Sequence, residues 1–109
     1  MAYIKNIEQD TVLSLAGQVE AQPGQIVSRT LAQNRAVSVT LFAFAQGEEI
    51  STHDSIGDAM VTVLEGTGRF TMDGKVHLLT QGQSLVMPAR GPHAVCGEER
   101  FKMLLTVVF

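Results

Sequence analysis

Alternation of apolar and polar side chains with a period of two runs through most of this chain and restricts its fold more than any other feature. In the segment 36–44 (AVSVTLFAF), every second residue from Val37 to Ala43 is apolar. The opposite face changes from polar at Ser38 to aromatic at Phe44. A period of two predicts a β-strand, and the aromatic end predicts burial on both faces.

The same period returns in the C-terminal segment 99–109, which is apolar on one face and partly apolar on the other. Asp73-Gly74 predicts a tight hairpin, because both residues tolerate positive φ. The segment 6–15 predicts either a short helix or an irregular entry. Further strands are predicted over 25–31, 59–64, 69–72, 76–79, 84–87 and 93–96. Short strands with turns every eight to twelve residues indicate an all-β sandwich or barrel, and a jelly roll, an immunoglobulin-like sandwich and an OB barrel all stay open.

Composition narrows the class of protein. A chain of 109 residues with 45% apolar and 17% charged residues suits one packed domain rather than a disordered chain. The net charge is −3 and no two Lys or Arg residues are adjacent, so no nucleic-acid partner is expected. Cys96 is the only cysteine, and no apolar run approaches the ~20 residues of a membrane span. Together with the lack of a signal peptide, these features predict a cytoplasmic protein with no membrane partner.

Two segments rich in glycine and histidine resemble the two motifs of the cupin superfamily. The first motif reads Gly-x5-His-x-His-x3,4-Glu-x6-Gly, and its positions are held here by Gly47, His53, Ser55, Ala59 and Gly66. The second reads Gly-x5-Pro-x-Gly-x2-His-x3-Asn, and its positions are held by Gly82, Pro88, Arg90, His93 and Gly97. The resemblance implies a double-stranded β-helix, or jelly-roll β-barrel. Residues 1–109 would form a single cupin domain, with an N-terminal segment and strand over 1–34 and the barrel over 35–109.

The departures from the family motifs bear on metal binding. In metal-dependent cupins, the two His and the Glu of the first motif and the His of the second hold one cation. Here His53 and His93 remain, whereas Ser55 and Ala59 replace the other two ligands, and Asp58 lies one residue before the carboxylate position. A divalent cation in an enclosed site needs several ligands and negative charge. His53 and His93 would therefore bind a divalent transition metal (Ni, Cu, Zn or Fe) only where Asp58 or solvent completes the shell, and binding no metal is at least as compatible with these residues.

The predicted ligand pocket is the barrel interior. Its expected residues are His53, Ser55, Ala59, Val61, His93 and Arg90. Arg90 is either a clamp for an anionic substrate at the barrel mouth or a solvated loop arginine. Cys96 is expected to be a buried structural thiol and His77 a solvated hairpin residue, and no catalytic residue is predicted.

Three functions stay open at this point. The first is a small cupin that binds a small molecule around His53 and His93 without assigned catalytic activity. The second is a metal-dependent enzyme, dioxygenase- or isomerase-like, acting on a small carbonyl or phenolic compound. The third is a structural or regulatory dimer with an incidental cavity. A homodimer is expected in every case, because a domain this small gains by covering sheet edges and apolar faces.

Overall fold

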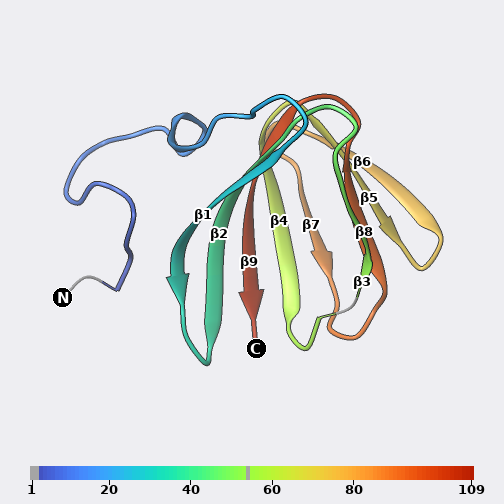
Figure 1. Ribbon diagram of the computed structural model, residues 1–109. Coiled ribbons are helices and arrows are strands. Elements are labelled where there is room, and N and C mark those ends of the chain that lie inside the picture. The colour runs from blue at the N-terminus through green and yellow to red at the C-terminus, as the bar shows by residue number, and fades with distance from the viewer. Residues whose placement is uncertain (1–2, 54) are drawn as a thin grey trace.

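Nine strands and one short 3-10 helix make up the computed structural model, which describes residues 3–53 and 55–109 except for the side chain of His53. The elements, shown in Figure 1, are η1 (Ala16–Gln18), β1 (Ile26–Gln33), β2 (Val37–Phe44), β3 (Glu49–His53), β4 (Asp58–Glu65), β5 (Thr67–Met72), β6 (Lys75–Thr80), β7 (Ser84–Met87), β8 (His93–Gly97) and β9 (Phe101–Val108).

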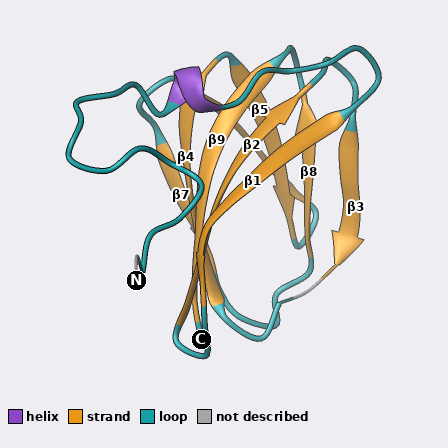
Figure 2. Ribbon diagram, turned by 60° about the vertical axis from the view of Figure 1, so that its left-hand side comes forward, coloured by secondary structure: helices purple, strands orange, loops and turns teal. Residues whose placement is uncertain are grey.

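The strands form two antiparallel sheets that face each other (Figure 2). The five-stranded sheet has the order β1-β2-β9-β4-β7, and the four-stranded sheet has the order β3-β8-β5-β6. The chain crosses repeatedly from one sheet to the other, so strands distant in sequence become neighbours, and β9 lies between β2 and β4. This arrangement is a jelly-roll β-barrel, which confirms the predicted fold class and decides between the three open architectures.

The inner faces of both sheets bury an aromatic cluster. The rings of Phe44 and Phe101 stack with centroids 4.7 Å apart, and Phe70 meets Phe101 edge-on at 6.0 Å. All three side chains are fully buried. Aromatic pairs in these geometries stabilise a core by about 0.5–1.5 kcal/mol beyond the area that they bury. The cluster therefore closes one end of the space between the sheets.

The outer face of the five-stranded sheet carries a second apolar cluster. Leu41 and Ala43 of β2 point outward and are fully buried, together with Val19 and Leu31. The predicted burial of β2 on both faces is confirmed, because Phe44 packs inward while its neighbour Ala43 packs outward. The cover comes from the chain itself, since the N-terminal segment packs on this face.

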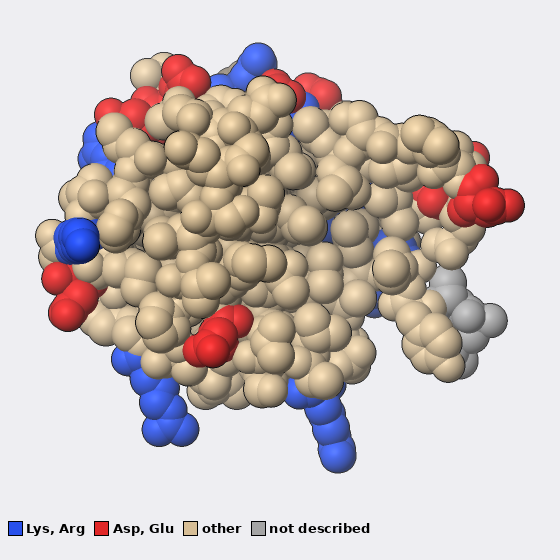
Figure 3. Space-filling model, turned by 180° about the vertical axis from the view of Figure 1, so that it is seen from behind, with Lys and Arg blue, Asp and Glu red and all other residues tan. Residues whose placement is uncertain are grey.

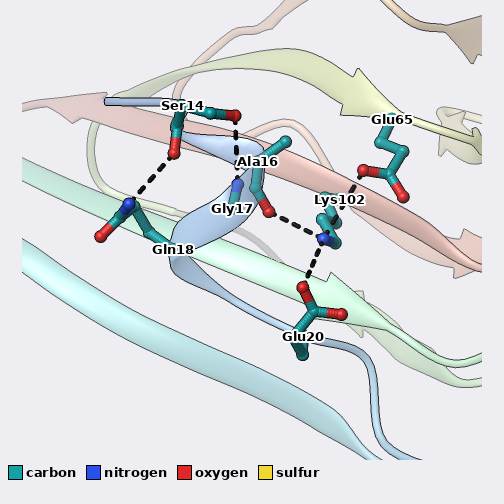
Figure 4. Close-up of polar contacts among 7 residues, drawn as sticks. All are labelled: Ser14, Ala16, Gly17, Gln18, Glu20, Glu65 and Lys102. Carbon is teal, nitrogen blue, oxygen red and sulfur yellow. Dashed lines mark hydrogen bonds and ion pairs between the residues drawn. The ribbon is translucent and has the colours of Figure 1, made fainter. Parts of the chain in front are cut away.

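Lys102 fastens this N-terminal cover to the barrel (Figure 4). Its side chain is only 6% exposed, and its Nζ donates to the carbonyl of Ala16 at 2.7 Å. The same ammonium pairs with Glu20 at 3.3 Å and with Glu65 of β4 at 3.5 Å. A buried charge needs such partners, because isolated burial costs several kcal/mol. One side chain of β9 thus joins the N-terminal segment to two strands of the sheet.

Two parts of the fold were not foreseen. No strand was predicted over β3, whose sequence EISTH lacks a clear alternation. The N-terminal segment adopts the irregular one of the two predicted forms. The N–H of its Lys5 donates to the carbonyl of Leu31 at 2.7 Å, at the point where β1 departs from regular pairing with β2.

None of the helices in the described part of the chain has the length and hydropathy of a membrane-spanning segment.

Two turn glycines with the same backbone conformation provide a matched test of the packing. Gly66 and Gly74 both have φ of +78°. A Cβ at Gly66 would lie 2.1 Å from the carbonyl oxygen of Arg100, whereas a Cβ at Gly74 would meet nothing within 4 Å. We expect Gly74→Ala to cost about 1–2 kcal/mol, which is the strain of positive φ alone. Gly66→Ala should cost at least ~2 kcal/mol more, because the clash is with backbone.

Urea denaturation of the two variants measures the free energy of unfolding. Equal losses at the two positions would contradict the close packing of the β4–β5 turn at Gly66 against Arg100 and Phe101.

Candidate functional site

A cavity of about 90 Å³ lies between the two sheets, at the end away from the stacked aromatic rings. Ten described residues line it, and Ser55 and His93 are the polar ones. The apolar ones come from both sheets and are Ile50, Ala59, Val61, Met87, Val95, Met103, Leu105 and Val107. Strand alternation places them there, since each occupies an inward position of its strand. The site is an apolar hollow with one polar end.

His93 is the first residue of β8 and is buried, with 4% of its surface exposed. Its Nδ1 lies 3.0 Å from the carbonyl oxygen of Gly91. Because a carbonyl only accepts, Nδ1 carries the hydrogen and is the donor of this bond. The β3–β8 register sets the backbone of His53 directly opposite His93. The predicted convergence of the two rings lies outside the described residues, because it depends on the His53 side chain.

Ser55 follows β3 and contributes the second polar group. Its Oγ accepts a hydrogen bond from the Gly57 N–H at 3.2 Å. Among the described residues, no acceptor takes the hydrogen of this hydroxyl. The carbonyl of Ser55 accepts the Arg90 N–H at 2.7 Å. Ser55 therefore offers one donor at the cavity and also fixes the loop that follows β7.

Arg90 takes a conformation that its residue type disfavours. Its φ is +65°, which costs a non-glycine residue about 1–2 kcal/mol. The cupin motif has Gly at this position, and the backbone here explains that preference. The Arg90 side chain is exposed and is not one of the residues that line the cavity.

Asp58 faces away from the cavity, contrary to the expectation that it could complete a metal shell. It is exposed, whereas the next residue, Ala59, is buried and lines the hollow. Its Oδ1 accepts the Ala89 N–H at 2.7 Å. Strand alternation explains the result, because successive residues point to opposite faces. Asp54, the neighbouring acidic residue, lies outside the described residues.

A family model for the cupin domain matches residues 40–108. This chain belongs to the cupin family. No curated protein matches it in sequence.

Solved structures show the same fold along the whole chain. A conserved protein of unknown function from Streptococcus pyogenes is 45% identical, with 99% of this chain and 95% of that chain covered and a TM-score of 0.96. A cupin superfamily protein from Desulfitobacterium hafniense is 37% identical, with 99% of both chains covered and a TM-score of 0.94. Salicylate 1,2-dioxygenase from Pseudoaminobacter salicylatoxidans is 20% identical, with a TM-score of 0.71, and 80% of this chain and 25% of that chain are covered. That last likeness shows the fold alone.

The described residues of the cavity do not by themselves make up the ligand set of an enclosed cation. They supply one imidazole and one hydroxyl, and the position of the family carboxylate is held by the methyl group of Ala59. No group of three or more His, Cys, Asp or Glu residues within 3–53 and 55–109 could hold a metal ion. Sites of this kind usually take three protein ligands, a carboxylate often among them. We derive no chemistry through a metal.

Two further residues differ from expectation. His77 was predicted to be solvated, yet it is half-buried and lies directly opposite the buried Phe70, so it is on the inner side of its sheet. Cys96 was predicted to be buried, yet it is half-buried and alternates with the inward-facing Val95. Neither residue lines the cavity.

Half of the lining residues that the sequence analysis did not place in the pocket come from β9, and the others are Ile50, Met87 and Val95. Met103, Leu105 and Val107 occupy one face of a strand whose alternation was recognised, so the signal was present. It did not reveal which apolar face turns toward the hollow and which turns toward the N-terminal segment.

The donor set predicts the metal content. Protein purified without a His-tag should contain far less than one equivalent of Ni, Cu, Zn or Fe per chain, because no carboxylate is among the described residues that line the cavity and neutral donors offset the desolvation of a cation poorly. Elemental analysis gives the stoichiometry, and thermal melting with and without EDTA should give the same midpoint. One tightly held metal ion per chain would contradict this prediction.

Proposed function

We propose that this cupin binds a small, mostly apolar molecule in the cavity between its sheets. The observation that carries the proposal is the composition of the lining, in which eight apolar residues surround a hollow that has Ser55 and His93 at one end. Ligand sites commonly combine an apolar wall with a few placed polar groups that fix orientation. The hydroxyl hydrogen of Ser55 supplies a donor for a carbonyl or carboxylate oxygen.

The size of the hollow limits the ligand. A cavity of about 150 Å³ in another protein holds benzene, which has six carbons. By the same ratio, about 90 Å³ holds a group of roughly three or four carbon atoms. A phenolic ring would not fit inside this hollow without expansion. A metal-dependent dioxygenase- or isomerase-like activity has less support, because the described donors do not suit a cation.

Filling the cavity should abolish binding. Ala59 is buried and lines the hollow, whereas the next residue of β4, Met60, is 45% exposed on the opposite face. We expect Ala59→Leu to place three additional carbons in the hollow at a cost to stability of under about 2 kcal/mol, since space exists for them. Met60→Leu is the matched control on the same strand.

Butyramide serves as a neutral probe for this test. Saturable chemical-shift changes at Val61 and Val95 on titration into the wild-type chain, retained in Met60→Leu and lost in Ala59→Leu, would support the cavity as the site. No saturable change in the wild-type chain with butyramide or butyrate, or an unchanged response in Ala59→Leu, would overturn the proposal.

We also propose that the chain forms a homodimer through the outer face of β4, β7 and β9. Met60 and Val86 are direct partners across two of these strands, and both are exposed, as is Val108 of β9. The N-terminal cover packs on the β1–β2 side of the same sheet, and the side of the molecule seen in Figure 3 has a broad area without charged groups. The outward residues in the middle of this face, Met60 and Thr62 of β4 and Ser84 and Val86 of β7, carry no charge, which allows two copies of net charge −3 to approach.

Light scattering at micromolar concentration should give the mass of two chains. Val86→Lys should reduce it to one chain, because a charge in an apolar interface is costly. Leu78→Lys is the matched control, since Leu78 and Val86 are both 55% exposed but Leu78 lies on the other sheet. A single-chain mass for the wild-type protein would contradict the dimer.

A further inference from the structure

The loop between β7 and β8, residues 88–92, is fixed to both polar residues of the cavity. The Arg90 N–H donates to the carbonyl of Ser55 at 2.7 Å, and the Gly91 carbonyl accepts from Nδ1 of His93 at 3.0 Å. A third bond joins the Ala89 N–H to Asp58 at 2.7 Å. The backbone of Arg90 is thus held at the polar end of the hollow.

The guanidinium of Arg90 has no hydrogen-bond or ion-pair partner among the described residues, and Arg90 is not one of those with further contacts. Asp58, the acidic residue that binds this loop, accepts the Ala89 N–H at its Oδ1 and forms no ion pair with Arg90. An arginine at a position of positive φ is a backbone outlier, and outliers of this kind concentrate at ligand sites. A planar guanidinium suits a carboxylate better than any other common organic anion apart from phosphate.

We propose that the ligand of this cavity is a short-chain monocarboxylate. Its carboxylate accepts a hydrogen bond from the Ser55 hydroxyl and lies beside the Arg90 guanidinium, and its alkyl tail fills the apolar hollow. This inference rests on the proposed function, since it names the chemical class that the same cavity takes.

The tail length follows from the volume. A hollow of about 90 Å³ accepts roughly three or four carbons, which corresponds to butyrate, valerate and their branched isomers. Each methylene that enters the hollow should strengthen binding by about fourfold, and a methylene beyond the limit should add nothing. Phosphate or sulfate lacks a tail and should not compete.

The test compares carboxylates with neutral amides of equal length. Calorimetric titration with acetate, propionate, butyrate, valerate and hexanoate should give affinities that rise about fourfold per carbon and level off at valerate. At low ionic strength, butyrate should bind more tightly than butyramide, and Arg90→Gln should weaken butyrate about threefold while leaving butyramide unchanged. The effect should fade in 0.5 M salt, because exposed charges are screened.

Matched variants separate the charge of Arg90 from general effects. Arg100→Gln makes the same change of net charge at the opposite end of the strands and should leave butyrate affinity unchanged. Arg90→Lys should restore most of the loss, and Ser55→Ala should weaken butyrate at least tenfold. Circular dichroism checks that each variant is folded.

The outcomes distinguish this inference from the proposed function. Equal affinity for butyrate and butyramide, with no effect of Arg90→Gln, would overturn the carboxylate while leaving the apolar cavity site intact. No binding of any acid or amide would overturn both. Affinity that still rises about fourfold from valerate to hexanoate would overturn the assigned tail length.

Discussion

Apolar side chains on both faces of the central strands impose the requirement that organises this protein. In β2, Phe44 is buried on the inner face of the five-stranded sheet, and Leu41 and Ala43 are buried on its outer face. Both faces of this sheet must therefore be covered by other parts of the chain. The second sheet covers the inner face. The N-terminal segment covers part of the outer face, and Lys102 joins it to the sheet through Ala16 and Glu20. The barrel and its irregular N-terminal segment therefore form one packed unit.

The sequence was informative wherever a period of two was strong. The strands around Leu41, Val61 and Met103 were predicted with boundaries close to those observed, and the glycine–histidine motifs indicated the jelly roll. β3 was missed because an edge strand with both faces partly wet needs no regular alternation. The path of residues 3–25 could not be predicted, because it depends on contacts with a face that exists only after the sheet has formed.

In the candidate site, too, some features could be predicted from the sequence and others could not. The inward positions of Ser55, Ala59, Val61 and His93 follow from register and motif spacing. The role of the Asp58 carboxylate does not, because its partner is an amide hydrogen thirty-one residues away in sequence. A hydrogen bond between a side chain and a distant backbone amide leaves no mark on composition or periodicity.

The hydrogen bonds of the β7–β8 loop have a consequence for recognition. Ala89 and Arg90 are held by Asp58 and Ser55 near the start of β4, and Gly91 is held by His93 of β8. A loop held in this way loses little conformational entropy when a ligand binds, so the entropic cost of binding is small. A rigid binding site of this kind selects ligands by shape, because its backbone cannot rearrange to accommodate a ligand that fits poorly.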